Sequence, residues 1–91
     1  MYVYITTNPG KNVLYTGVTN DLKRRIREHE KNRGDQKSFS GKYYCNKLVF
    51  YEEFDSPADA IKRENEIKKL SRAKKLKLIA VRNPKMVFYQ M

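Results

Sequence analysis

The chain has 91 residues, 40% of them hydrophobic, so we expect one folded domain over residues 1–91 with a modest core. Twenty Lys and Arg against ten Asp and Glu give a net charge of +10, which favours a nucleic acid as partner over a merely solvated basic surface or acidic lipids. No apolar run is long enough for a membrane span, no signal peptide is evident, and the single Cys45 excludes an internal disulfide, so we expect a cytoplasmic location.

The first two segments read as a β-hairpin. Residues 1–7 and 12–19 alternate in the manner of strands, and Asn8-Pro9-Gly10-Lys11 is a turn signal between them. A symmetric loop centred on Pro9-Gly10 predicts that Ile5 pairs with Leu14, and Tyr4 with Tyr15. Alternation gives one core face and one tyrosine face; the predicted members are Met1, Val3, Ile5, Leu14 and Val18 on the first, and Tyr2, Tyr4, Tyr15 and Gly17 on the second.

Residues 20–31 predict a helix capped by Thr19 or Asn20, followed by a polar loop over 32–42. Helical steps extend its short apolar stripe to Arg25 and His29, four residues apart and therefore adjacent. Two interpretations stay open for this pair, namely a solvated helix edge and a site in which arginine binds phosphate while histidine moves or shares a proton.

The second half predicts one strand and two helices. The strand covers 47–54, and Ser56 with Pro57 begins a helix that runs towards residue 70. Another helix covers 72–82 and is stopped by Asn83-Pro84. The order ββαβαα predicts an α/β (α+β) fold, in which a three-stranded, at least partly antiparallel sheet is flanked by helices.

Glu64 interrupts the apolar face of the helix that begins at Ser56, because Ala60 and Ile67 lie on the same face. A buried carboxylate is costly unless it is paired or bound to a metal. It could therefore form a salt bridge or bind a hard cation such as Mg²⁺.

Basic residues gather in two runs. Residues 62–77 contain eight Lys or Arg, and residues 20–33 contain six. Each run could be a solvated helix face, but together they predict two walls of a groove that binds phosphates.

The same residues carry a family resemblance. Tyr2-Val3-Tyr4 and Tyr15-Thr16-Gly17 are followed by Val-Thr-Asn-Asp-Leu-Lys-Arg-Arg-Ile-Arg-Glu-His at 18–29, then by Ala-x-x-x-Glu-x-x-Ile-Lys around Glu64 and by Asn83-Pro84. This ordered set resembles the GIY-YIG endonuclease superfamily, especially its small stand-alone bacterial members, over nearly the whole chain.

The resemblance implies metal-dependent hydrolysis of phosphodiester bonds in DNA, rather than RNA, on a sheet of three antiparallel strands. Tyr4 and Tyr15 would be the signature tyrosines, with Tyr15 as the general base or its partner. Arg25 would contact the scissile phosphate, His29 would support proton transfer or orient the nucleophile, and Glu64 would bind Mg²⁺ or Mn²⁺. The residues expected to contact nucleic acid are Gly17, Thr19, Asn20, Lys23, Lys68, Lys69, Arg72 and Asn83.

Two functions remain in competition on the sequence alone. One is an endonuclease acting in DNA repair or on branched or single-stranded DNA. The other is a basic nucleic-acid-binding module with a vestigial nuclease site.

Overall fold

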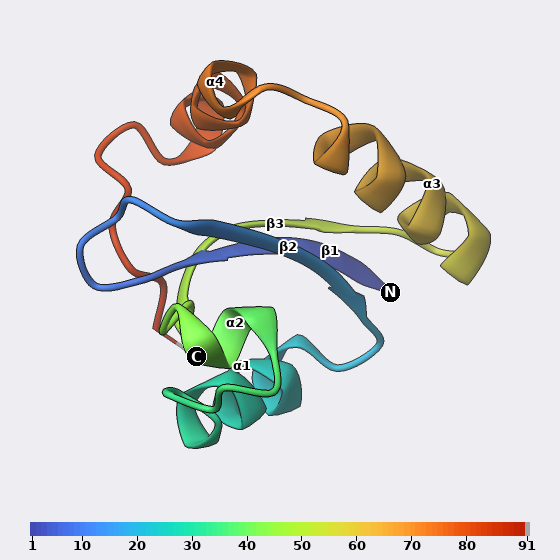
Figure 1. Ribbon diagram of the computed structural model, residues 1–91. Coiled ribbons are helices and arrows are strands. Elements are labelled where there is room, and N and C mark those ends of the chain that lie inside the picture. The colour runs from blue at the N-terminus through green and yellow to red at the C-terminus, as the bar shows by residue number, and fades with distance from the viewer. Residues whose placement is uncertain (91) are drawn as a thin grey trace.

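The computed structural model describes residues 1–90, without the side chains of residues 39 and 40. Its elements are β1 (Tyr2–Thr7), β2 (Leu14–Thr19), α1 (Leu22–Lys31), α2 (Phe39–Lys42), β3 (Lys47–Glu53), α3 (Pro57–Lys68) and α4 (Arg72–Arg82). The strands form one antiparallel sheet in the order β2-β1-β3 (Figure 1). The predicted fold is confirmed, and the predicted loop at 32–42 contains the additional short helix α2.

The predicted hairpin register is wrong by two residues. Tyr4 pairs with Gly17, and Tyr15 pairs with Thr6. The connection is longer than a tight turn because the Asn8 side chain organises it, accepting hydrogen bonds from the backbone N–H groups of residues 12 and 13. A shift of two residues preserves the alternation of faces, so the predicted core face and tyrosine face are both correct.

Local capping sets where the helices begin. Asp21, rather than the predicted Thr19 or Asn20, caps α1 by accepting a hydrogen bond from the backbone of Arg24. Ser56 caps α3, and Ser71 caps α4, in the same way. Proline at the first position of α3 agrees with the predicted start of that helix.

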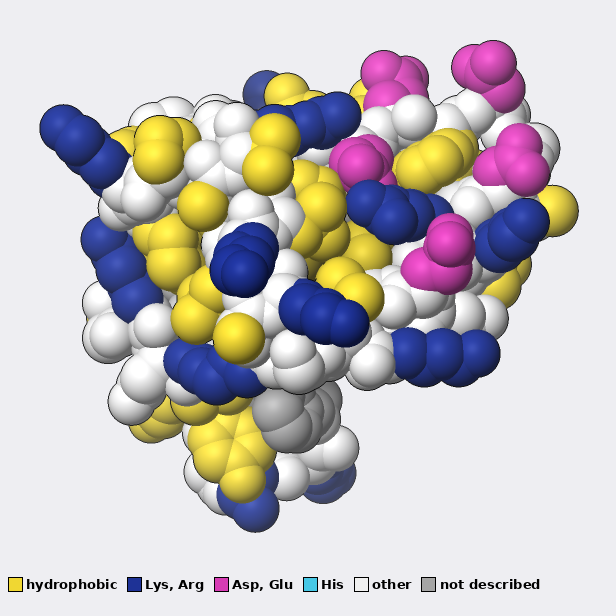
Figure 2. Space-filling view, turned by 90° about the horizontal axis from the view of Figure 1, so that it is seen from above, with side chains coloured by type: hydrophobic (Ala, Val, Ile, Leu, Met, Phe, Trp, Pro, Cys, Tyr) yellow, Lys and Arg dark blue, Asp and Glu magenta, His cyan; other side chains and the backbone are white. Residues whose placement is uncertain are grey.

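The helices lie on opposite faces of the sheet (Figure 1). Helices α3 and α4 cover the face of Val3 and Ile5, whereas α1 packs against the face of Tyr4. The two basic runs, on α1 and on α3–α4, therefore do not face each other, and the prediction that they form two walls of one groove is wrong. Figure 2 shows the α3–α4 face, where Lys and Arg side chains are spread widely and the acidic ones gather at the α3 side.

The chain segment after α4 covers the outer edge of β3. The backbone N–H of Tyr89 donates to the carbonyl of Leu48, and the Asn83 side chain donates to that of Val49. Arg82 donates to the carbonyl of Tyr51. These contacts satisfy backbone groups that an edge strand would otherwise expose. In the part of the chain that the structure describes, no helix has the length and apolar character that a membrane span requires.

Candidate active site

A chain of hydrogen bonds joins α1 to β1 on the tyrosine face. The Tyr4 hydroxyl lies 2.9 Å from Nε2 of His29 and accepts a hydrogen bond from Nε of Arg25 at 3.3 Å. Tyr4 is 1% exposed and His29 is 4% exposed. The structure thus brings together Tyr4, Arg25 and His29, as the resemblance implied, and places two of the three beneath the surface.

Gly17 makes room for the Tyr4 ring. A Cβ atom at position 17 would lie 2.5 Å from the Tyr4 hydroxyl oxygen and 2.6 Å from Cζ. Gly17 is expected from the resemblance to contact nucleic acid, but the group that lies against it is the side chain of Tyr4. Gly17 is buried, so its role here is to seat Tyr4.

Burial keeps the side chains of Tyr4 and His29 neutral at pH 7. Burial, assisted by the positive charge of Arg25, lowers the pKa of His29 to about 4, so the imidazole is neutral at pH 7. Burial is also the main reason that the pKa of Tyr4 rises to about 12, so its hydroxyl keeps its proton. The Tyr4 hydroxyl and Nε2 of neutral His29 share one hydrogen bond, in which the tautomer of the imidazole decides which of the two donates.

Arg25 carries the charge of the cluster towards solvent. Burial alone would lower its pKa, but hydrogen bonding with Tyr4, Tyr15 and Glu28 outweighs burial and raises it. Its side chain is 36% exposed and borders an open hollow of about 440 Å³, together with Thr19 and Asn20. The guanidinium is therefore partly exposed at this hollow, where it also forms an ion pair with Glu28 at 3.4 Å.

Tyr15 belongs to the same cluster although it is not opposite Tyr4 in the sheet. Its ring centroid lies 5.3 Å from that of His29 and 6.3 Å from that of Tyr4. Unlike Tyr4 it is only half-buried. Of the two signature tyrosines, Tyr15 is therefore the more exposed.

Glu64 comes from α3, which packs over β2 and β1 from the other side of the sheet. Its side chain is 14% exposed and forms an ion pair with Lys68 at 3.5 Å. Its negative charge contributes to the raised pKa of Tyr4, so it is within electrostatic reach of the cluster. Glu66, two residues further along α3, is exposed.

The chemistry of Glu64 fits a sparsely liganded Mg²⁺ ion. Among the residues described, no three His, Cys, Asp or Glu side chains form a group able to hold a metal. Mg²⁺ commonly keeps several waters and binds one or two carboxylates together with substrate phosphates. One largely buried carboxylate is therefore an adequate protein contribution, and Lys68 would have to release it.

The predicted nucleic-acid contacts divide between two parts of the surface. Asn20 and Lys23 are exposed near the start of α1, whereas Thr19 is largely buried and its hydroxyl is hydrogen-bonded to the backbone of Asp21. Lys68, Lys69 and Arg72 are exposed near the α3–α4 junction. Arg72 lines a hollow beside the β1–β2 connection, away from Arg25.

Asn83 has a structural role instead of the predicted contact with nucleic acid. Its amide donates to the carbonyls of Val49 and Val87 and accepts from the N–H of Val87, each at 2.9 Å. The residue is 5% exposed. The side-chain amide of Asn83 therefore uses its donor and acceptor groups to hold the C-terminal segment against β3.

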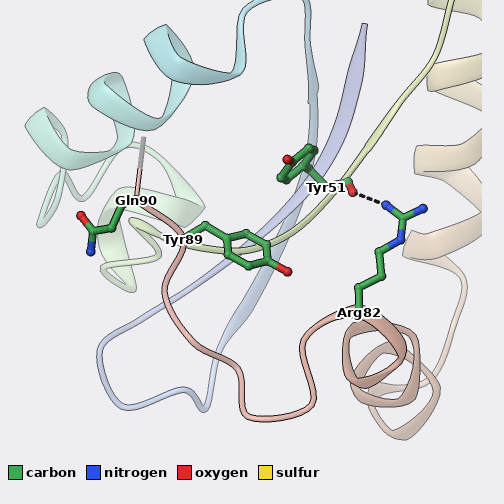
Figure 3. A pocket seen from close by; sticks show the side chains of 4 residues that line it. All are labelled: Tyr51, Arg82, Tyr89 and Gln90. Carbon is green, nitrogen blue, oxygen red and sulfur yellow. Dashed lines mark hydrogen bonds between the residues drawn. The ribbon is translucent and has the colours of Figure 1, made fainter.

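Sequence reasoning missed an aromatic row that crosses from β1 over β3 to the C-terminal segment. The Tyr51 ring lies 6.2 Å from that of Tyr2 and 5.9 Å from that of Tyr89, and Arg82 reaches over from α4 (Figure 3). The alternation of β3 could have placed Tyr51 on the tyrosine face. No spacing rule could have placed Tyr89 beside Tyr51, because Tyr89 reaches β3 only through the path of the chain after α4.

Comparisons with known proteins place the chain in a family. Residues 1–77 match GIY-YIG, described as the GIY-YIG catalytic domain. The chain is 44% identical to a UPF0213 protein of Natronomonas pharaonis over 87% of this chain and 89% of that protein. It is 42% identical to a UPF0213 protein of Staphylococcus saprophyticus, over 87% and 93% respectively.

Among solved structures, the chain is similar to the solution NMR structure of a UPF0213 protein from Bacillus halodurans. The TM-score is 0.57 with 34% identity, covering 92% of this chain and 86% of that one. The family match includes Tyr4, Tyr15, Arg25, His29 and Glu64 and stops before Asn83. The chain therefore belongs to the GIY-YIG catalytic domain family.

Proposed function

We propose that this protein is a metal-dependent endonuclease that hydrolyses DNA phosphodiester bonds, acting in repair or processing of branched or single-stranded DNA. The observation that carries the proposal is the hydrogen-bonded set of Tyr4, Arg25 and His29 beside Tyr15, with the charged end of Arg25 at an open hollow. A fold needs no such arrangement for stability, because buried polar networks offer little over apolar packing.

Each residue has a distinct role in this proposal. Arg25 contacts the scissile phosphate and stabilises the charge that grows on it. Tyr4 accepts a hydrogen bond from the guanidinium and is itself hydrogen-bonded to neutral His29, so the two residues position Arg25. Tyr15 takes the proton of the attacking water directly or through a partner; since a tyrosine hydroxyl is a weak base at neutral pH, the nearby positive charge of Arg25 is required. Glu64 would bind Mg²⁺ or Mn²⁺, which when bound supplies Lewis-acid stabilisation of phosphate oxygens.

One observation favours the alternative of a non-catalytic binding module. The Glu64 carboxylate is already paired with Lys68, which is what a vestigial metal site would retain. A basic surface with this pairing could bind nucleic acid without cleaving it.

A nicking assay separates the two functions. Wild-type protein is incubated with supercoiled, single-stranded and branched DNA and a structured RNA, in Mg²⁺, Mn²⁺ or chelator. Glu64→Gln is expected to reduce metal-dependent cleavage by at least about 100-fold, whereas Glu66→Gln, two residues away on the exposed side of α3, leaves it unchanged. Cleavage that survives in chelator or in Glu64→Gln contradicts the metal site, and salt-sensitive binding without any cleavage supports the binding module.

A further inference from the structure

The aromatic row consists of Tyr2 on β1, Tyr51 on β3 and Tyr89 in the segment after α4. Adjacent ring centroids are 6.2 and 5.9 Å apart, with interplanar angles of 65° and 81°. Tyr51, in the centre, is 39% exposed, and Tyr2 and Tyr89 are half-buried. A large ring left this accessible on an edge strand contributes little to the core, so its exposed surface is available to a ligand.

Hollows on both sides of Tyr51 make the row a continuous surface. One, of about 350 Å³, lies between Tyr51 and Tyr2 and is bordered by Asn20 and Lys23. The other, of about 390 Å³, lies between Tyr51 and Tyr89 and is bordered by Arg82 (Figure 3). Tyr51 thus stands between two recesses, each with a cation at its border.

The same surface reaches the candidate active site. Asn20 borders both the hollow beside Arg25 and the hollow between Tyr2 and Tyr51. In the other direction, Tyr89 borders a further hollow that also contains Lys47. A chain-like ligand held at Arg25 could therefore continue past Tyr51 towards Tyr89.

Charge and chemistry identify the ligand. The cations around these hollows are Lys23, Arg27, Lys47 and Arg82, against Asp21 and Glu30, and Glu30 is already paired with Arg33. Aromatic rings interleaved with cations match the alternating bases and phosphates of a single strand, because every base has a face that can stack. A duplex offers its phosphates but keeps its bases stacked inside.

We propose that Tyr2, Tyr51 and Tyr89, with Lys23 and Arg82, form a base-stacking platform for a single-stranded nucleic acid leading away from Arg25. The platform deepens the proposed function, since it rests on a nucleic acid as the substrate and selects its single-stranded form. Unlike the metal site, it acts in binding and needs no catalysis.

Fluorescence anisotropy in chelator, where metal-dependent cleavage cannot occur, tests the platform. The probes are a fluorescein-labelled single-stranded 12-mer of DNA, its RNA counterpart and the matching DNA duplex. Tyr51→Ala is expected to weaken single-strand binding by about 5- to 100-fold and to leave duplex binding within about twofold. Tyr51→Phe keeps the ring and should bind like wild type.

The control is Tyr44→Ala, because Tyr44 is 50% exposed and does not border these three hollows. Quenching of a 2-aminopurine base in the 12-mer reports stacking directly and should be lost in Tyr51→Ala alone. Equal losses for duplex and single strand, or unchanged single-strand binding, would overturn the platform. Absent cleavage together with Tyr51-dependent single-strand binding would refute the nuclease and leave the platform standing.

Discussion

Gly17→Ala places a methyl group where the ring of Tyr4 already lies. The new Cβ would be 2.5 Å from the Tyr4 hydroxyl oxygen and 3.0 Å from Cε1, both well inside normal contact distances. The ring cannot move aside cheaply, because it is 1% exposed and its hydroxyl is held by Arg25 and His29. Either Tyr4 leaves its hydrogen bonds or strand β2 shifts.

The expected cost can be worked out from these contacts. Overpacking a core typically costs about 1–3 kcal/mol, and losing a buried hydrogen bond adds about 1 kcal/mol. Restricting the unfolded chain by replacing glycine offsets about 0.4–1 kcal/mol. The free energy of unfolding should therefore fall by about 2 kcal/mol, which for a domain of this length lowers Tm by roughly 8–16 °C.

Urea and thermal unfolding followed by circular dichroism measure this change. Gly10→Ala is the matched control, because its nearest new contact would be 3.5 Å, an ordinary distance, and it should be neutral or slightly stabilising. Tyr4→Leu should relieve the clash, so Gly17→Ala must cost less in that background. Equal costs with and without the Tyr4 ring, or a fully stable Gly17→Ala, would refute the account of this glycine.

Three further predictions concern pH, the C-terminal segment and salt. His29 binds a proton near pH 6.5 in the unfolded state but only near pH 4 in the folded state. Between these values the unfolded state binds more protons, so acidification favours unfolding. The contribution of neutral His29 to the free energy of unfolding is therefore complete above pH 6.5 and falls by about 2 kcal/mol on acidification to about pH 5. His29→Gln should lack that extra loss in pH-dependent urea unfolding, and parallel curves would contradict the lowered pKa. Asn83→Ala removes three hydrogen bonds and should lower the free energy of unfolding by about 3 kcal/mol. The DNA affinity of the folded protein, measured by anisotropy at low temperature, should stay the same. A loss of DNA affinity without a loss of stability would show that Asn83 contacts nucleic acid after all. Replacing Lys69 and Arg72 with Gln should weaken DNA binding for all sequences and reduce the salt slope by about 2, whereas an unchanged slope places the phosphates elsewhere.

The elements could be predicted because their signals are local. Ser56 with Pro57 marks the start of α3, and Asn83-Pro84 marks the end of α4, just as the structure has them. The hairpin register depends instead on how Asn8 folds the loop by bonding two later N–H groups. No rule based on Pro9-Gly10 contains that geometry.

The site was harder to predict where it depends on tertiary packing. Helical spacing brought Arg25 and His29 together correctly, and alternation placed Tyr4 and Tyr15 on their face. Which face of the sheet each helix covers is decided by the connections and the core, so the two basic runs could not be placed from sequence. Asn83 was misjudged because a buried asparagine and a substrate-binding one look alike in a sequence.

Tyr4 and His29 are neutral at pH 7, and Arg25 is the charged member of the cluster. Tyr4, with a pKa of about 12, holds its proton too firmly to act as a base, and His29, with a pKa of about 4, is too buried to carry charge at neutral pH. The positive charge of Arg25 itself helps to keep His29 neutral, so the only charge of this triad stands at the hollow, with neutral donors and acceptors behind it. The guanidinium thus faces an incoming anion with neutral groups beneath it, and the carboxylate of Glu28, 3.4 Å away, is the group that a phosphate would displace. In the proposed hydrolysis, the proton of the attacking water would then be taken nearer to solvent, and of the two signature tyrosines Tyr15 is the more exposed.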